Sequence, residues 1–496
     1  MKYTIGIDLG TSSLKGIILS REGEVVLSAS SEYEIHTPQS GYSEQNPQDW
    51  VEAFDIVMDK LFSNYSDLKG NVDGISFSGQ MHSLVVLDSD NEVIRPAILW
   101  NDVRTSKQSD LINRNLNQEI IKITKNRSLE GFTLPKLMWL RENEPSNYKK
   151  INSILLPKDY LRYILTGNKH IDLSDAAGTL LLDLEGECWS EDLCEEYGVD
   201  INALPPLIKS AGFTGILTGL YSQKYGEIKV FAGGADNACA ALGAGIINSE
   251  RSMVSIGTSG VLLSAEEDMK NYKGLLHFFN HCSDNYYYSM GVTLSAGLSL
   301  SWIRGIIDPD LTYSELLKDI SMAPIGADGL IFNPYLMGER TPHFDASARG
   351  SFVGLDVIHT KDHILRSVVE GITFSLKNSL DLINGTRPER IKEIVSVGGG
   401  AKNIEWLQIQ ADIFDTPIRT LTVEEGPSLG AAMLAALGAN WFRDINECVD
   451  CCVKVNELIY PIKENVLEYE EFYRIYNHVY SSLVEVNHLL SEKKKR

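Results

Sequence analysis

Two short glycine-rich turns in this sequence carry the residue types that hold phosphate groups. The first lies in MKYTIGIDLGTSSLKGIIL at the start of the chain, and the second lies in RSMVSIGTSGVLLSA near its middle. Strand-like runs flank both turns, so backbone N–H groups and small hydroxyls are expected to face one side. Thr11 and Thr258 occupy matching places, separated by almost half of the 496-residue chain. The spacing predicts a duplicated domain with one phosphate cradle in each copy, although either turn alone would pass as a tight hairpin.

The two cradles differ at one position, and the difference suits a metal-bound nucleotide. Asp8 ends the strand before the first turn, whereas Ser255 stands at the matching place in the second. A carboxylate at a strand end can hold a hydrated Mg²⁺, and glycine lets the backbone approach an anion closely. One carboxylate between two cradles is therefore expected for a nucleotide gripped from both domains together with one metal ion.

A further carboxylate, Asp236, lies just before the second cradle. The segment KVFAGGADNACAALGAG predicts a strand, a Gly-Gly turn and a helix of small residues that begins near Asp236 and Asn237. In phosphoryl transfer, a protein positions the nucleotide, neutralises charge and supplies a carboxylate that accepts the proton of the acceptor hydroxyl. Asp236 fits that last role. Asp also serves well as a helix N-cap, and the two roles can coexist.

A glycine cluster near the end of the chain is suited to the nucleoside part of a nucleotide. In VSVGGGAKN, the apolar strand pattern of residues 391–397 leads through the glycines into the helix-like NIEWLQIQADIF. Such a turn admits adenine or ribose against bare backbone, with Asn403 as a polar contact. A dinucleotide fingerprint needs G-x-G-x-x-G, but Asn403 stands at the sixth position, so a dehydrogenase is disfavoured.

Length and composition predict a globular protein of two domains. A chain of 496 residues exceeds the size at which one core keeps growing, and 43% hydrophobic with 23% charged residues is typical of folded proteins. The net charge of −22 and the pI of about 4.9 disfavour nucleic acid and anionic membranes as partners. The N-terminus alternates like a strand and lacks the pattern of a secretion signal, which predicts a cytoplasmic protein.

The pattern of elements predicts a mixed α/β architecture in two halves. Strands are expected at residues 3–9, 13–19 and 24–29, then a helix opened by Asn46-Pro47, then strands at 72–78 and 83–87. The uncharged stretch 285–302 is expected to form a buried strand and helix instead of a membrane span. AALGA occurs at 240 and again at 435, which predicts close packing of small-residue helices. Cys448, Cys451 and Cys452 have no second Cys or His pair nearby, so reduced or buried thiols are expected there instead of zinc.

A series of segments occurs in one order along the chain: IGIDLGTSSLK, YSEQNPQDW, SGQMHSLVVLD, RPAILWND, LPKDYL, SDAAGT, GGADNA, SIGTSGV, GERTPH and VGGGAKN. GFTLPKLMWLREN, and GSFVGL followed by HILRSVVE, look like two family signatures. In these segments the sequence resembles the FGGY family of carbohydrate kinases over nearly its whole length. The resemblance implies two duplicated ribonuclease H-like domains of the actin-like and hexokinase-like superfamily, residues 1–246 and 247–496, with a cleft between them.

The resemblance also assigns roles to individual residues. It implies that Asp236 is the catalytic base and that Asp8 organises Mg²⁺. The implied sugar-binding residues are Met81, His82, Trp100, Asn101, Asp102 and Asn237. The implied ATP contacts are Thr11, Ser12 and Thr258 on the phosphates and Gly297, Gly400 and Asn403 at the adenosine end. Without the family, Met81 would be read as core filler and His82 as a structural histidine.

The activity implied by the resemblance is ATP-dependent phosphorylation of D-xylulose to D-xylulose 5-phosphate, with gluconate, ribulose and L-xylulose as alternative acceptors. Ser83 and Ala235 stand where the relatives that act on D-xylulose often have glycine, and these changes put the sugar in question more than the chemistry. An actin-like or heat-shock-like ATPase switch shares the duplicated loops but needs neither the SGQMHS segment nor Asp236. A homodimer is left open by the sequence.

Overall fold

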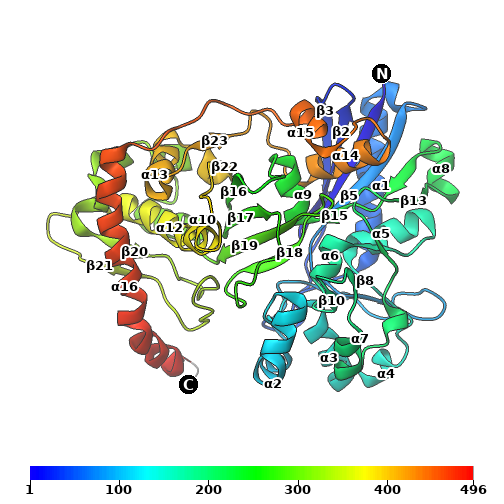
Figure 1. The fold of residues 1–496 in the computed structure, drawn as a ribbon, viewed down its shortest axis with the longest axis horizontal. Helices are drawn as coiled ribbons and strands as arrows, with labels where there is room; N and C mark the ends of the chain where they lie inside the picture. The colour runs from blue at the N-terminus through cyan, green and yellow to red at the C-terminus, as the bar shows by residue number, and fades with distance from the viewer. Residues whose placement is uncertain (495–496) are drawn as a thin grey trace.

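The computed structural model describes residues 1–494, without the side chains of residues 66, 115–117 and 494. The first half of the chain is built on a seven-stranded sheet of order β13-β14-β5-β1-β2-β3, with β15 paired to β5 (Figure 1). Its strands are β1 (Tyr3–Leu9), β2 (Ser13–Ser20), β3 (Val25–Glu32), β5 (Val72–Gly79), β13 (Phe213–Ile216), β14 (Lys229–Phe231) and β15 (Gly234–Ala235).

The second half is built on a six-stranded sheet of order β18-β19-β17-β16-β22-β23. Its strands are β16 (Arg251–Ile256), β17 (Gly260–Glu266), β18 (His277–Asn280), β19 (Tyr287–Thr293), β22 (Glu393–Gly398) and β23 (Ile418–Thr420). The hairpin of β16 and β17 pairs in parallel with β22, as the hairpin of β1 and β2 pairs in parallel with β5. The predicted duplication is therefore confirmed in the topology.

Several elements begin where their sequence signals place them. Helix α1 (Pro47–Asn64) starts after Asn46, whose side chain accepts a hydrogen bond from the backbone N–H of Gln48, and its apolar face packs on the first sheet. The stretch 285–302 forms β19 and the start of α10 (Gly297–Ile307), as predicted. Within residues 1–494, no helix is both long and apolar enough to cross a bilayer.

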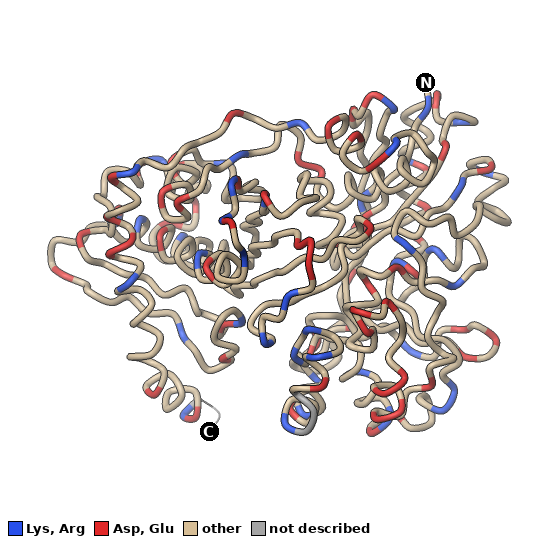
Figure 2. Tube along the Cα trace, in the orientation of Figure 1, with Lys and Arg blue, Asp and Glu red and all other residues tan. Residues whose placement is uncertain are grey.

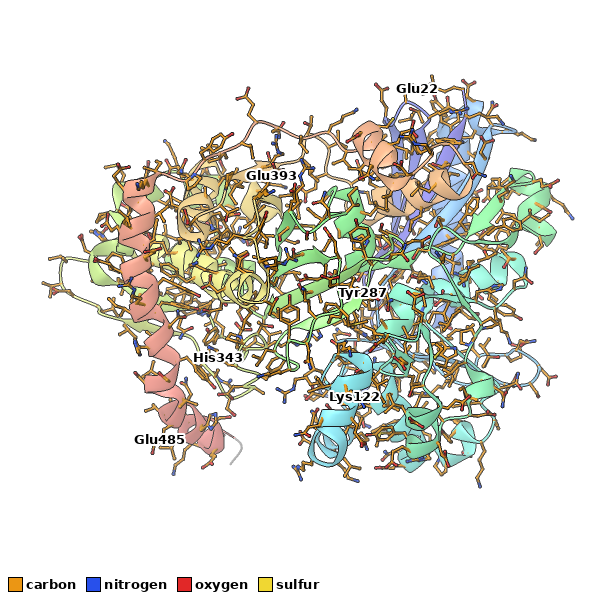
Figure 3. The ribbon with its side chains drawn as sticks, in the orientation of Figure 1. Glu22, Lys122, Tyr287, His343, Glu393 and Glu485 are labelled. Atoms are coloured by element: carbon orange, nitrogen blue, oxygen red, sulfur yellow. The ribbon has the colours of Figure 1, made fainter. Side chains whose placement is uncertain are left out.

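Helices on the second sheet carry one of the two family-like signatures. Helix α12 (Lys361–Asn384) packs against α13 (Ile404–Phe414) and α16 (Lys463–Lys494). Arg366 and Glu370 on α12 form a buried ion pair of 2.6 Å, and the Tyr469 hydroxyl of α16 donates to Glu370 at 2.9 Å. Further along α16, the Tyr480 ring stacks on His343, which Figure 3 places beside this helix. The long C-terminal helix is thus fixed along the outer side of the second half.

The first half also carries a series of helices that follow α1. These are α2 (Ser106–Thr124), α3 (Thr133–Asn143), α4 (Pro145–Tyr148), α5 (Pro157–Thr166), α6 (Leu173–Ala177), α7 (Glu191–Tyr197) and α8 (Gly219–Tyr225). Short strands link them, including β6 (Val85–Leu87), β8 (Ser153–Leu155) and β9 (Ile171–Asp172). Acidic and basic residues alternate along both halves, without a continuous basic stripe among the described residues (Figure 2).

The two halves are joined by a close helix crossing beside the first sheet. Helix α14 (Pro427–Gly438) comes from the second half of the sequence but packs on β1, β5 and α9 (Asp236–Gly243), so it lies beside the first sheet in Figure 1. A Cβ atom on Gly430 would lie 2.0 Å from the Cys239 carbonyl oxygen, and one on Gly6 would lie 2.0 Å from that of Ser428. The predicted small-residue packing of the two AALGA segments is confirmed. The expected domain boundary at residue 246 falls between α9 and β16.

The close packing of α9 and α14 predicts that one added methyl group at Gly430 lowers the stability of the protein. Gly430→Ala forces a Cβ into the Cys239 carbonyl and should lower the free energy of unfolding by about 2 kcal/mol or more, measured by urea denaturation. Gly305→Ala on α10 is the matched control, because a Cβ there meets no heavy atom within 4 Å and alanine favours a helix. Equal stability of the two variants would contradict the crossing.

Candidate active site

Three parallel strand ends bring the predicted catalytic groups to one edge of the first sheet. Asp8 on β1 lies opposite Ser78 on β5, and Gly234 on β15 pairs with Ser78 from the other side. Asp236 follows β15 directly and begins helix α9. Open α/β sheets bind ligands at the carboxyl ends of their strands, so this edge is the expected place for a site.

Asp236 is held as the first residue of α9 and does not serve as its N-cap. The N-cap position is Ala235, which offers no side-chain hydrogen bond. Asp236 Oδ1 accepts from the backbone N–H of Asn237 at 2.7 Å and from its Nδ2 at 2.9 Å. Burial and the neighbouring charge of Asp8 raise the pKa of Asp236 to about 7. The carboxyl group is thus tuned to exchange a proton near neutral pH.

Asp8 is half-buried beside the first cradle. Burial raises the pKa of its carboxyl group to about 6, while the Ser78 hydroxyl, which donates to Oδ1 at 2.9 Å, and the charge of Lys15 act in the opposite direction. Lys15 Nζ in turn contacts Glu425 Oε2 at 2.5 Å, just before α14. The first cradle is therefore tied to the second half of the sequence by an ion pair.

The first cradle is shaped by residues that its sequence pattern does not single out. The Gly10 N–H donates to the Ser13 carbonyl at 3.0 Å, which closes the turn. The Tyr33 hydroxyl donates to the Gly10 carbonyl at 2.6 Å, and Gln45 Nε2 donates to the Thr11 carbonyl at 2.7 Å. These bonds occupy the carbonyls of the turn. Ser12 lies exposed at its tip.

Met81 and His82 lie at the end of β5, beside Asn237. Met81 Sδ accepts weak hydrogen bonds from Asn237 Nδ2 at 3.7 Å and from the Tyr288 hydroxyl of the second half at 3.6 Å. His82 has a φ of 66°, uncommon for a residue with a side chain, and its Nδ1 lies 2.6 Å from the Gly178 carbonyl oxygen. Burial lowers the pKa of His82 to about 3, so the ring is neutral, donates from Nδ1 and leaves Nε2 as an acceptor.

The strained turn at His82 is supported from the first family-like signature. The His82 carbonyl accepts from Thr133 Oγ1 at 3.0 Å and from Lys136 Nζ at 2.9 Å. Lys136 is fully buried and also donates to the Gly131 carbonyl at 2.6 Å. Sequence reasoning missed Lys136, because a lysine in a helix is usually solvent-exposed.

The environments of three neighbouring residues, Trp100, Asn101 and Asp102, differ. Trp100 is half-buried, and its Nε1 donates to Thr11 Oγ1 at 2.9 Å, so it joins the cradle to the predicted sugar pocket. Asn101 is exposed. The Ser83 hydroxyl, one of the departures from glycine, accepts from the Trp100 N–H at 3.0 Å.

Asp102 departs from the expectation that it lines the sugar pocket. It is fully buried, and its carboxylate accepts from the Ser43 N–H at 2.6 Å and pairs with the Arg104 guanidinium at 2.7 Å. All its acceptor capacity is directed into the protein. A polar residue next to a pocket segment can face either way, and the sequence carried no signal for the Arg104 pairing.

A cavity of about 510 Å³ in the second half gathers the residues predicted for adenosine and the second cradle. Its lining includes Thr258, Gly297, Gly400 and Asn403, together with the apolar side chains of Ile256, Leu298, Leu300, Leu317 and Trp406. The Gly297 N–H donates to the Gly257 carbonyl at 2.8 Å, which brings the N-terminus of α10 against the second turn. Asn403 caps α13, where its Oδ1 accepts from the Trp406 N–H at 2.8 Å. An apolar cavity with two helix N-termini suits a nucleotide.

Family comparisons agree with this geometry. Residues 3–243 match the N-terminal domain of the FGGY family of carbohydrate kinases, and residues 252–439 match its C-terminal domain. The chain belongs to this family. The FGGY fold is the duplicated actin-like and hexokinase-like architecture, and its members transfer a phosphoryl group from ATP to a carbohydrate.

Individual relatives cover the FGGY chain from end to end. The xylulose kinase of Lactococcus lactis is 49% identical over 99% of both chains. Among solved structures, the xylulose kinase of Lactobacillus acidophilus is 28% identical with a TM-score of 0.93, over 98% of this chain and 99% of that one. The gluconate kinase of the same organism is also 28% identical with a TM-score of 0.93, over 97% and 98%.

The two carboxyl groups predict a two-step pH dependence for this kinase. The base role predicted for Asp236 requires a deprotonated carboxylate, so kcat/KM for the acceptor should fall tenfold per pH unit below about pH 7, where Asp236 gains its proton. The slope should approach two below about pH 6, where Asp8 also gains a proton. The Mg²⁺ predicted at Asp8 would compete with protons, so raising its concentration should move both breaks to lower pH.

Ser78→Ala provides a sharper form of this test. Loss of the hydroxyl that lowers the pKa of Asp8 should move the second break above pH 6. Ser76→Ala is the control, since this hydroxyl lies two residues earlier on the same strand and has no hydrogen-bond partner among the described residues. A single break with a slope of one throughout, in all three proteins, would contradict the paired carboxylates.

Proposed function

We propose that this chain transfers the γ-phosphoryl group of ATP to the C5 hydroxyl of D-xylulose and releases D-xylulose 5-phosphate and ADP. The observation that carries the proposal is the placement of Asp236. Its carboxyl group has a pKa raised to about 7 and lies at the strand edge that also presents Asp8 and Met81. The 49% identity to the Lactococcus lactis xylulose kinase supports the choice of sugar.

Asp236 acts as the general base in this proposal. Asn237 occupies Oδ1 with two hydrogen bonds, which leaves Oδ2 to accept the proton of the sugar hydroxyl. As that proton moves to Oδ2, the hydroxyl oxygen attacks the γ-phosphorus and the bond from that phosphorus to the β–γ bridging oxygen breaks. A raised pKa makes the carboxylate basic enough for this transfer at neutral pH.

Asp8 is proposed to hold the Mg²⁺ of the nucleotide. Two neighbouring half-buried carboxyl groups with raised pKa values form a site whose charge a dication would offset. Within residues 1–494, no group of three or more His, Cys, Asp or Glu side chains is placed to hold a metal ion. A site with few protein ligands still suits Mg²⁺, because this ion usually keeps water molecules and phosphate oxygens as ligands. When bound beside Asp8, Mg²⁺ would offset the negative charge of the nucleotide phosphates during transfer.

The nucleotide is proposed to span the two cradles. The adenosine part would occupy the apolar cavity beside Gly400 and Asn403, where the N-terminus of α13 supplies a positive dipole end. The phosphates would extend toward Thr258 and, across the junction, toward Thr11 and Ser12. The Gly10 and Thr11 carbonyls already have internal donors, and the Gly10 N–H closes the turn, so the N–H groups of Thr11 and Ser12 and their hydroxyls are proposed to meet the phosphate oxygens.

The sugar is proposed to lie between Asn237, the neutral His82 and Trp100. An uncharged sugar is not repelled by the two neighbouring carboxylates or by the net charge of −22 that the chain carries. The gluconate kinase of Lactobacillus acidophilus matches the fold as well as the xylulose kinase does, so phosphorylation of gluconate is the second candidate. We also place the reaction in the cytoplasm, where seven free cysteines would stay reduced.

The proposed base predicts a specific defect in Asp236→Asn. This variant should bind ATP and the sugar with near-normal affinity, measured by calorimetry, and phosphorylate the sugar about 100-fold more slowly or worse. Asn keeps the size of the side chain and its acceptor oxygen but cannot take the proton. Turnover within tenfold of the unsubstituted enzyme would refute the assignment.

The proposed sugar predicts a ranking of kcat/KM in an assay of ADP release. D-Xylulose should exceed L-xylulose, D-ribulose and gluconate, because a misplaced hydroxyl leaves buried polar groups without partners. A rival that exceeds D-xylulose tenfold would overturn the substrate but leave the family assignment intact.

A further inference from the structure

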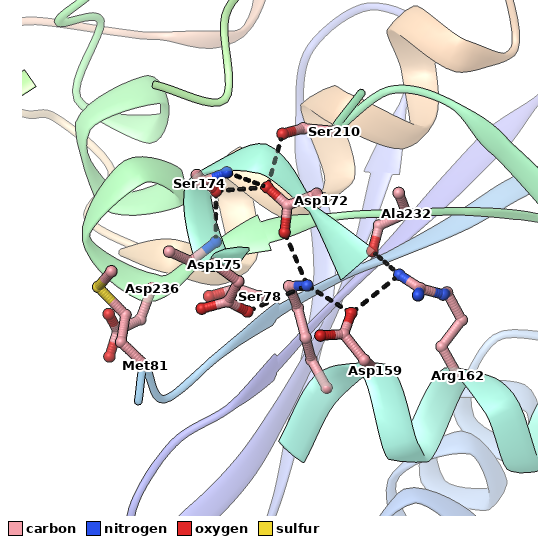
Figure 4. Close-up of polar contacts among 12 residues, drawn as sticks. Ser78, Met81, Asp159, Arg162, Asp172, Ser174, Asp175, Ser210, Ala232 and Asp236 are labelled. Carbon is pink, nitrogen blue, oxygen red and sulfur yellow. Dashed lines mark hydrogen bonds and ion pairs between the residues drawn. The ribbon is translucent and has the colours of Figure 1, made fainter. Parts of the chain in front are cut away.

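Helix α5 carries two buried cations that point into the interior of the first half. Lys158 and Arg162 are fully buried and lie one helical turn apart, and the buried Asp159 contacts both, at 2.7 Å from Lys158 Nζ and 3.2 Å from Arg162 Nη1. Lys158 Nζ also contacts Asp172 Oδ1 at 2.8 Å and Asp175 Oδ2 at 3.0 Å. We call these five residues the buried ion cluster (Figure 4).

Stability alone does not explain the buried ion cluster. Removing two cations and three carboxylates from water is costly, and apolar side chains of similar volume usually stabilise a protein as well or better. Burial raises the pKa of Asp175 well above its usual range, and its Oδ1 has no hydrogen-bond partner among the described residues. Because burying these charges is costly, we expect the buried ion cluster to hold nearby residues in a geometry that an apolar core would not hold.

Hydrogen bonds connect the buried ion cluster to two residues just before Asp236, Ala232 and Ala235. Arg162 Nη1 donates to the Ala232 carbonyl at 2.7 Å. On the other side, the Ala235 N–H donates to Ser174 Oγ at 2.9 Å, and that hydroxyl donates to Asp172 Oδ2 at 2.5 Å. The path from Lys158 through Asp172 and Ser174 therefore ends on the amide of the residue that precedes the base.

The segment 232–235, which these hydrogen bonds hold, also packs tightly against β5. Gly233 has a φ of 84°, and a Cβ there would lie 1.9 Å from the Phe77 carbonyl oxygen. The Lys158 side chain packs under the end of the same strand, where a Cβ on Gly79 would lie 2.7 Å from Lys158 Cβ. One lysine thus supports both the strand that leads to Met81 and, through Asp172, the segment that leads to Asp236.

Helix α9 has no side-chain N-cap to fix the backbone of its first residue, although Asn237 holds the Asp236 carboxylate from within the helix. Its N-cap residue, Ala235, lacks a side-chain acceptor, so the position of Asp236 is determined by the backbone that enters the helix. We propose that the buried ion cluster, acting through Ser174, positions the Asp236 carboxylate for proton transfer. Ser174 is then a positioning residue, and the inference rests on the proposed role of Asp236 as the base.

Ser174→Ala tests the positioning without creating an unpaired buried charge. It leaves the Ala235 N–H without its acceptor, so kcat should fall about 10- to 100-fold, as misplacement of a catalytic group implies. KM for MgATP should stay within twofold, because the nucleotide cavity lies in the second half. The acidic limb of the pH profile should move to lower pH, since a looser segment admits water to Asp236.

Ser210→Ala is the matched control. The Ser210 hydroxyl donates to the same oxygen, Asp172 Oδ2, at 3.0 Å, but its side chain does not contact the Ala235 N–H. Its kcat should stay within threefold of the unsubstituted enzyme. Ser174→Thr keeps the hydroxyl and should restore most of the kcat lost in Ser174→Ala, and a Tm measured for each variant reports any loss of folding.

The outcomes separate positioning from a structural role. An unchanged kcat in Ser174→Ala, or equal losses in Ser174→Ala and Ser210→Ala with an unmoved pH profile, would overturn the inference. Asp236→Asn, assayed in parallel, separates this failure from that of the proposed function. If Asp236→Asn turns over normally, the base is wrong; if it is inactive while Ser174→Ala is normal, only the positioning is wrong.

Discussion

The burial of two neighbouring carboxyl groups at one sheet edge is the constraint on which this site depends. Asp8 lies on β1 and Asp236 follows β15, two strands that pair with β5 from opposite sides, and the charge of Asp8 contributes to the raised pKa of Asp236. Like charges this close are unfavourable unless a cation or a proton accompanies them. In the proposed reaction, a metal-bound nucleotide and an acceptor hydroxyl would supply the cation and the proton.

The helix crossing connects this site to the second half of the molecule. Asp236 begins α9, and Cys239, one turn later, lies against Gly430 of α14. The nucleotide cavity belongs to the second half, whereas Met81, His82 and Asn237 belong to the first. The proposed transfer requires these regions to face each other, and the small-residue crossing beside Asp236 is one contact that joins the two halves.

Local signals in the sequence were sufficient for the scaffold. Alternating residues and glycine turns located both hairpins, Asn46-Pro47 located the start of α1, and the four residues assigned to the second cradle and adenosine line one cavity. These local signals do not indicate where an individual side chain points. Asp102 turned inward to Arg104, and buried Lys136 and Lys158 support the pocket from regions that are distant in sequence. Partners of this kind are fixed by tertiary contacts that no periodicity encodes.

A crystal structure with a non-hydrolysable ATP analogue, Mg²⁺ and D-xylulose tests the central claim most directly. The account predicts Mg²⁺ beside Asp8, bound directly or through water, and the C5 hydroxyl oxygen within about 2.6–3.2 Å of Asp236 Oδ2. A metal ion bound away from Asp8, or a C5 hydroxyl directed at a different base, would contradict it.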